Sequence, residues 1–140
     1  MAFIDENHFI VYDDGGRSKY FKAKDVRDCV TRALAIATKR DYKEVYDMLY
    51  EEAKESPRNG VKKKAWKNVA RKLGGVWHPC TGIGTGCTMH LNPDEIPNEK
   101  RMVMQVSKHL CAVINGKVHD TFDCTRDGER CVYGYWVFNN

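Results

Sequence analysis

Two short stretches of this sequence contain side chains that together could cleave an acyl bond. The stretch "RDCVTRAL" contains Cys29, and the stretch "HLCAVINGKVHDTFD" contains His109, Asp120 and Asp123. A carboxylate that orients an imidazole prepares the ring to take a proton from a nearby thiol, and the resulting thiolate is a good nucleophile. The spacing therefore raises the question of which elements would bring residue 29 and residues 109–123 together.

Residues 109–123 are predicted to form a β-hairpin, because two runs rich in apolar and β-branched residues flank an Asn-Gly pair. A two-residue type I′ turn sets the register, so that His109 and Asp120 become diagonal neighbours on one face of the ribbon. Asp123 replaces Asp120 if the turn shifts, and His119 is expected on the opposite face, toward solvent. The expected cross-strand pairs are Ile114 with Lys117, Ala112 with His119, and Cys111 with Asp120.

Cys29 is expected at the first position of a helix, directly after the N-cap candidate Asp28. The partial positive charge of a helix N-terminus lowers the pKa of a thiol, and a nearby imidazolium lowers it further. The backbone N–H of the same residue points to where an oxyanion would form. We therefore expect a cysteine nucleophile early in the chain and its histidine late, on a strand.

The elements that must position these residues divide the chain into a helical half and a strand-rich half, which indicates the α+β class. Residues 8–22 read as a hairpin or as a strand and a loop. Apolar residues at helical spacing predict helices over residues 25–40, 41–55 (with a capping box from Asp41 and Glu44) and 61–75 (closed by Gly74 or Gly75). A short strand is predicted over residues 75–80, and strands expected in one antiparallel sheet are predicted over residues 101–107, 109–115, 117–122 and 131–138.

The predicted inward faces of the helices follow the same spacing. They comprise Val30, Ala33, Leu34 and Ala37, then Tyr42, Val45, Tyr46, Leu49 and Ala53, and then Trp66, Val69, Ala70 and Leu73.

The 140 residues are enough for a single domain, 1–140, and 42% hydrophobic with 30% charged residues suits a folded chain rather than a disordered one. A net charge of +4 is mild and does not by itself indicate nucleic acid. No apolar run reaches the roughly 20 residues that cross a bilayer, and no signal peptide is recognisable. We therefore expect a cytoplasmic protein with six largely unpaired cysteines, in which Cys124 and Cys131 could pair only under oxidation.

The stretches "DCVTRALAIAT" and "SKHLCAVINGKVHDTFD" resemble the nucleophile helix and the histidine hairpin of the papain-like cysteine peptidases, of small bacterial and phage type. The segments "SPRNGV", "GIGTGC" and "RCVYGYW" extend the likeness to a group of phage-encoded proteins of similar length. The resemblance implies a papain-like fold, with N-terminal helices packed on a C-terminal antiparallel sheet, and location in the host cytoplasm if the protein is phage-encoded. It assigns Cys29 as nucleophile, His109 as general base and Asp120 as the residue that orients it.

One feature departs from that family: the window "YFKAKDVRD" lacks the glutamine or asparagine that usually precedes the cysteine as an oxyanion donor. Lys22, Lys24, Gln105 or a backbone N–H are the candidates to replace it. The expected substrate is a protein or peptide, with neither a metal nor an organic cofactor required.

The glycine-rich loop in "HPCTGIGTGCTMH" is expected to let a substrate chain approach, so that Gly84, Gly86 and the neighbouring Trp77 are the predicted substrate-binding residues. The same stretch has a metal alternative, because it offers donors of the types that bind zinc. Those donors are His78, Cys80, Cys87 and His90.

Two functions outside catalysis stay open. The fold could serve as a non-catalytic, phage-type binding module, or the lysine-rich helix over residues 61–73 could bind nucleic acid. The second is the weaker alternative, because a charged outer face is the ordinary property of a surface helix. Its cations are Lys62, Lys63, Lys64, Lys67, Arg71 and Lys72. The sequence indicates neither membrane association nor an oligomeric state.

Overall fold

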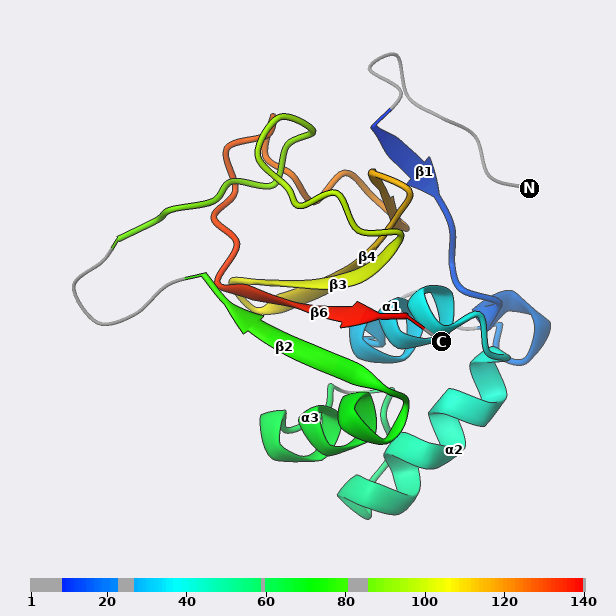
Figure 1. Cartoon of the computed structure of the whole chain (residues 1–140). Coiled ribbons are helices and arrows are strands. Elements are labelled where there is room, and N and C mark those ends of the chain that lie inside the picture. Colours follow the sequence, from blue (N-terminus) through cyan, green and yellow to red (C-terminus); the bar gives the residue numbers. More distant parts are fainter. Residues whose placement is uncertain (1–8, 23–26, 59, 81–85, 140) are drawn as a thin grey trace.

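The computed structural model describes residues 9–22, 27–58, 60–80 and 86–139. Within this part of the chain, three α-helices and a six-stranded sheet form one α+β fold (Figure 1). The helices are α1 (Cys29–Thr38), α2 (Tyr42–Ala53) and α3 (Lys63–Lys72). The strands are β1 (Ile10–Tyr12), β2 (Gly75–Pro79), β3 (Arg101–Val106), β4 (His109–Ile114), β5 (Lys117–Asp120) and β6 (Gly134–Phe138).

The sheet is mixed, with the strand order β1-β5-β4-β3-β6-β2. The C-terminal strands β3 to β6 pair antiparallel, as expected, and β2 joins them antiparallel, but β1 adds to the edge parallel to β5, so the sheet as a whole is mixed. The turn after β1 explains the difference: the carboxylates of Asp13 and Asp14 accept from the N–H groups of Gly15 and Gly16. The chain therefore turns away toward α1 instead of returning as a hairpin.

The hairpin of β4 and β5 has the predicted turn and register. Asn115 and Gly116 both have positive φ, of 49° and 81°, which a type I′ turn requires. Ala112 pairs with His119, and Ile114 with Lys117. The turn chemistry of two residues therefore sets which side chains of the hairpin share a face.

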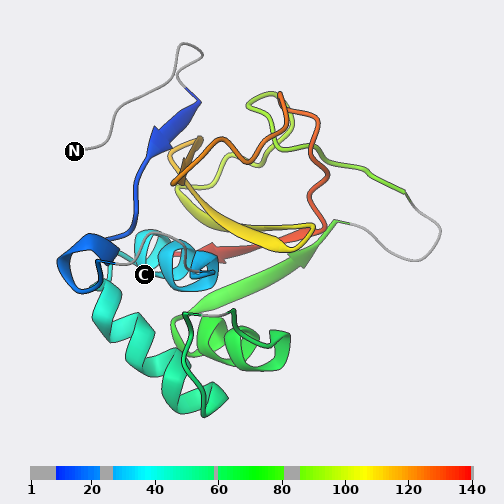
Figure 2. The same cartoon turned by 180° about the vertical axis from the view of Figure 1, so that it is seen from behind.

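The core has two parts, one on each face of the sheet. All three helices lie on one face, where Leu110, Ala112 and Trp136 form one cluster with the predicted inward sides of α1 and α3, and α2 packs on those two helices. Figures 1 and 2 show the helices together on that side, while the segments 86–100 and 121–133 cross the other face. There, Met102, Met104, Cys111 and Val113 contact apolar residues of those segments, among them Leu91, Cys124 and Val132.

Two predicted N-cap residues lie at the expected helix starts, but their side chains do not cap the helices. Asp28 and Asp41 are the N-cap residues of α1 and α2, yet neither side chain accepts a capping hydrogen bond from a backbone N–H of its own helix. The Asp41 carboxylate instead accepts from the hydroxyl of Tyr20, at 2.7 Å. The C-terminal end of α3 is closed by Gly74, with φ of 93°, whereas Gly75 begins β2.

The only disulfide among the described residues joins Cys87 to Cys131. The alternative pairing of Cys124 with Cys131 is wrong, because Cys124 is a free, buried thiol beneath the sheet. The backbone of Cys131 instead pairs with that of His90 in an isolated antiparallel β-bridge. In the described ranges we find no helix with the length and apolarity needed to cross a bilayer.

We expect Gly134→Ala to destabilise the protein by about 1–3 kcal/mol, because overpacking a filled site forces its neighbours to move. A Cβ at residue 134 would overlap the six-membered ring of Trp77. Urea unfolding measures the cost. Adding Trp77→Leu makes room, so the double variant should lose less stability than the sum of the two single variants; strict additivity would contradict the proposed packing.

Candidate active site

The β4–β5 hairpin brings His109 onto Asp120, as the sequence predicted. The distance from Nε2 of His109 to Oδ2 of Asp120 is 2.5 Å, and the second carboxylate oxygen accepts from the N–H of Thr121 at 2.7 Å. Asp123 is wrong as a substitute: its carboxylate accepts from the backbone and hydroxyl of Thr125. Both oxygens of Asp120 therefore have partners, and the imidazole is held in one orientation.

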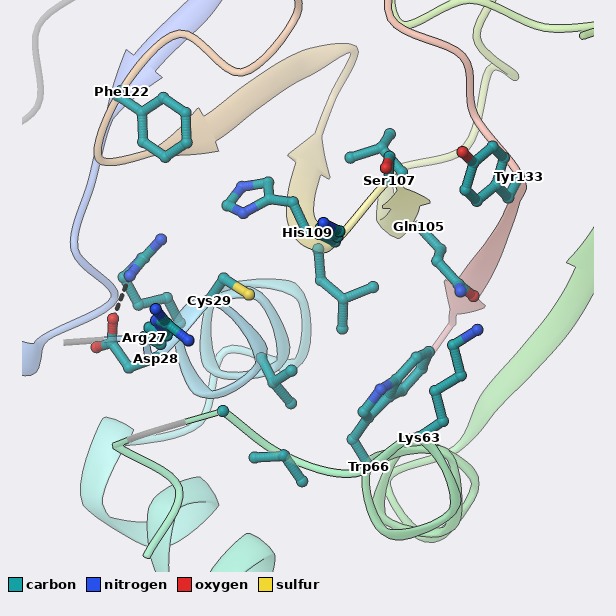
Figure 3. A pocket seen from close by; sticks show the side chains of 17 residues that line it. Arg27, Asp28, Cys29, Lys63, Trp66, Gln105, Ser107, His109, Phe122 and Tyr133 are labelled. Carbon is teal, nitrogen blue, oxygen red and sulfur yellow. Dashed lines mark hydrogen bonds and ion pairs between the residues drawn. The ribbon is translucent and has the colours of Figure 1, made fainter.

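Cys29 begins α1 and lies beside the same histidine. Burial raises the pKa of the Cys29 thiol, but its hydrogen bond to His109, the charge of that ring and the N–H of Leu110 outweigh burial, so its pKa lies below the ordinary value. In Figure 3 the sulfur of Cys29 and the ring of His109 face the same hollow. The helix N-terminus and the hairpin therefore meet as expected, and the thiol is prepared to ionise.

The pKa of His109 is raised to about 11: burial alone would lower it, but hydrogen bonds to Asp120, Cys124 and Cys29 prevail. Burial likewise opposes ionisation of Asp120, but its bond to His109 and the charges of His109 and Arg32 hold the carboxyl pKa below its usual range. The ring of Phe122 lies against the imidazole, with centroids 5.2 Å apart. At neutral pH the site therefore holds an imidazolium between an ionised carboxylate and a thiol whose ionisation the imidazolium favours.

A buried arginine joins the two halves of this site. Arg32, one turn after Asp28 on α1, binds the Asp28 carboxylate through one nitrogen and Asp120 through the other, at 3.1 Å. Asp28 is fully buried and also accepts from Tyr42, at 2.7 Å, and from Arg17, at 3.0 Å. The nucleophile helix is therefore tied by charge to the carboxylate that orients the histidine.

The thiol of Cys124 reaches His109 from inside the protein. It accepts a hydrogen bond from Cys111, which lowers the pKa of Cys124 and raises that of Cys111 well above its usual value. Donor atoms of His109, Asp120 and Cys124 lie within 4.8 Å of one another. Their types suit zinc, so these three residues could hold a metal ion if the histidine released its partners.

The site opens into a cleft of about 810 Å³. Besides Cys29 and His109, its walls include Trp66, Gln105, Phe122 and Tyr133. Gln105, one candidate oxyanion donor, lies across the cleft from Cys29 in Figure 3. Lys22 is not among the described lining residues, and Lys24 lies outside the described part of the chain.

The first turn of α1 supplies the remaining candidate, a backbone N–H. Helices leave their first N–H groups without partners inside the helix. The Asp28 side chain forms no cap there, because it binds Arg17, Arg32 and Tyr42 instead. The N–H of Cys29 therefore lies beside its own sulfur, where a carbonyl oxygen under attack would develop charge.

The predicted substrate-binding residues receive no support from this cleft. Trp77 packs beside Trp136, with ring centroids 5.3 Å apart, and covers Gly134. Gly86 is exposed, with φ of 67° and open space around it, and Gly84 lies outside the described residues. Neither Trp77 nor Gly86 is among the described residues that line the cleft.

The alternative zinc site around the glycine-rich loop is wrong, because Cys87 forms a disulfide with Cys131. The ring of His90 pairs with Glu95 at 2.9 Å, and His78 stacks on Tyr135. The disulfide removes the thiolate of Cys87, and the ion pair with Glu95 engages Nδ1 of His90.

His119 also differs from expectation. It lies on the opposite face from His109 but is only partly exposed, and its Nδ1 lies 3.1 Å from Asp13, the residue after β1. It therefore helps to hold the parallel edge strand.

The cations of α3 have several different surroundings. Lys72 pairs with Glu52 at 2.7 Å, and Lys67 lies over the rings of Trp66 and Trp77. Lys63 lines the cleft. Helix α3 is therefore not a uniform cationic stripe, and binding of nucleic acid stays an untested alternative.

The sequence did not predict three groups that contact the candidate catalytic residues: Arg32, Cys124 and the N–H of Leu110. The pair Asp28 and Arg32, spaced i,i+4, was a visible signal, although it suggests a surface pair. The reach of Arg32 to a residue 88 positions later had no local signature.

Removing the imidazole should make Cys29 less reactive, because the imidazolium stabilises the thiolate. We expect His109→Ala to slow iodoacetamide labelling of Cys29 at pH 6 by at least about tenfold, equivalent to one pKa unit or more. Peptide mapping after timed alkylation gives the rate. His119→Ala, on the other face of the hairpin, should leave it unchanged; equal rates in wild type and His109→Ala would contradict the contact.

We expect Arg32→Gln to lower the free energy of unfolding by about 3–5 kcal/mol at pH 7, because it leaves buried carboxylates without their cation. Arg40→Gln, which breaks an exposed pair with Glu44, should cost less than about 1 kcal/mol.

The cost of Arg32→Gln should depend on pH. The depressed pKa of Asp120 contributes stability above about pH 4, which is lost as the pH falls through the lowered value. In the Arg32→Gln variant, Asp120 has lost its cation and therefore takes up a proton at a higher pH than in the wild type. The difference from wild type should therefore shrink below about pH 5, and a difference that is constant from neutral to acid pH would refute the charge bridge.

Comparisons of this chain with protein families, with curated proteins and with solved structures found no match. The resemblance to papain-like peptidases therefore stays a prediction, and arguments about function rest on the geometry of Cys29, His109 and Asp120.

Proposed function

We propose that this protein is a cysteine-dependent hydrolase of the papain-like type that cleaves peptide or isopeptide bonds. One observation carries the proposal: a thiol at a helix N-terminus, an imidazole and a carboxylate form a continuous chain at the wall of an open cleft. Cys29 is the nucleophile, His109 the acid and base, and Asp120 the residue that orients it. Each role matches the surroundings of the side chain that fills it.

The reaction begins from the ion pair of Cys29 and His109. The thiolate sulfur attacks the carbonyl carbon, and the carbonyl oxygen takes up the negative charge next to the N–H of Cys29. When the C–N bond breaks, the leaving amine takes the proton of the imidazolium, and the acyl group remains on sulfur as a thioester. His109 then takes a proton from water, which attacks the thioester and releases a carboxylic acid and the thiol.

The environment of His109 suits both steps. Asp120 lies at Nε2, which leaves the other ring nitrogen for the thiol and, later, for the leaving group and water. A carboxylate held by Arg32 and by the N–H of Thr121 stays ionised and cannot easily turn away. The bridge from Asp28 to Asp120 therefore acts on the chemistry through the position of the ring and through the charge of Arg32, which lowers the pKa of Asp120 and of Cys29.

An activated ester tests the proposal without knowledge of the natural substrate. With 4-nitrophenyl acetate, we expect a burst of nitrophenolate equal to the enzyme concentration and an acetyl group on Cys29, detected by mass spectrometry. Cys29→Ala should remove the burst, and Asp120→Asn should slow it by about 10²-fold or more, because a disoriented base is a poor one. Cys80→Ser is the control, since burial raises the pKa of that half-buried thiol.

The outcomes separate the alternatives. A burst that survives Cys29→Ala would refute the nucleophile. Alkylation of Cys29 at pH 6 without any burst, or hydrolysis of any peptide, would favour the non-catalytic binding module. Loss of activity on adding a chelator would favour a metal at His109, Asp120 and Cys124, since the thiol mechanism needs no metal.

A further inference from the structure

The charged side chains around the mouth of the cleft are almost all of one sign. Arg27 precedes α1, Lys63 begins α3, and Lys108 lies in the turn between β3 and β4; all three are exposed and line the cleft. Asp28 is the only carboxylate among the described lining residues, and it is fully buried and bonded to Arg17, Arg32 and Tyr42. No acidic group in the described lining therefore offsets the three exposed cations.

No described carboxylate lies within ion-pair distance of Arg27, Lys63 or Lys108, so their charges are not neutralised by the described part of the chain. Some exposed cations elsewhere do have acidic partners within ion-pair distance: Arg40 with Glu44, Lys43 with Asp47, Lys54 with Glu51, and Lys72 with Glu52. A cleft lined by one sign of charge attracts and concentrates ligands of the opposite sign. The rim is therefore prepared for negative charge supplied from outside.

The floor of the cleft is apolar. Val61, Trp66 and Leu110 line the same cleft as the cations, and Trp66 and Leu110 are buried members of the core. A ligand that fits must combine carboxylates that reach the rim with an uncharged chain that lies along the floor. A peptide with acidic side chains has this character.

We propose that the cleft takes acidic peptide chains, with glutamate or aspartate side chains on both sides of the acyl group that reaches Cys29. This inference rests on the proposed function, because a thiol nucleophile acts on an acyl carbon and not on a phosphodiester. The carboxylates bind Lys63 and Lys108, and Arg27 holds a further one on the side of α1. Nucleic acid, which would also be drawn to the cations, is the competing occupant.

Two alkylating reagents of matched size test the charge of the site on the full chain. The Cys29 thiolate displaces iodide from either reagent, with formation of the S–C bond as the C–I bond breaks, but iodoacetate is anionic and iodoacetamide is neutral. Relative to the same two rates for 2-mercaptoethanol, we expect iodoacetate to be favoured by at least about threefold at Cys29, and the preference to fall with added salt. A ratio equal to that of the free thiol and flat in salt would overturn the inference.

Charge reversal locates the effect. Lys63→Glu and Lys108→Glu should each reduce the iodoacetate preference, and the double variant should abolish it. Lys64→Glu is the matched control, because Lys64 is equally exposed on α3 but is not among the described lining residues. An equal effect from Lys64→Glu would assign the preference to net charge and not to the cleft.

Competition separates the two occupants. Hexaglutamate should protect Cys29 from iodoacetamide at concentrations at which hexaglutamine does not, and Lys63→Glu should remove the protection. Protection by an oligothymidylate of equal charge that matches or exceeds that by hexaglutamate would overturn the peptide proposal in favour of nucleic acid.

Failure of this inference is distinguishable from failure of the proposed function. The iodoacetate preference is a ratio of two alkylation rates, so it does not depend on turnover, whereas the ester burst uses a neutral probe and does not depend on the rim. A burst without an iodoacetate preference would support the proposed hydrolase function and reject the inference that its substrate is acidic.

Discussion

The buried charge bridge from Asp28 through Arg32 to Asp120 is the constraint on which the rest of the site depends. Removing charges from water is costly, and an ion pair inside a protein is tolerated only when its geometry and remaining hydrogen bonds are good. Here Tyr42, Arg17 and the N–H of Thr121 provide those bonds. The bridge links the first turn of α1 to the end of β5, so the sulfur and the imidazole are held at one relative position.

That position follows from how the helices and the sheet share the core. α1 packs across β4 through Leu34, Leu110 and Ala112, while its N-terminal end extends to the end of the sheet where the β4–β5 hairpin begins and ends. The cleft is the space left there between α1, α3 and the turn before His109. The packing of the helices that covers one face of the sheet therefore also forms a groove with a thiol at its wall.

Local chemistry accounts for what could be predicted. The Asn-Gly turn determined the hairpin register and the contact of His109 with Asp120, and apolar spacing determined the inward faces of the helices. Contacts between segments far apart in the sequence had no such local signal. The parallel pairing of β1, the role of Arg32 and the bond from Cys87 to Cys131 each depend on where distant segments meet. Asp28 was placed correctly at the helix start, but Tyr42 and Arg17, which divert its side chain, lie outside its own helix.

The bond between Cys87 and Cys131 closes a covalent ring over 44 positions, and this ring contains β3, β4 and β5 but not α1. Both members of the His109–Asp120 pair are inside the ring, and the nucleophile is outside. Closing a ring of this length restricts the unfolded chain by about 4 kcal/mol. A reductant therefore has two opposed effects on this molecule: it keeps the sulfur of Cys29 competent, and it opens the ring that restrains the strands carrying its base.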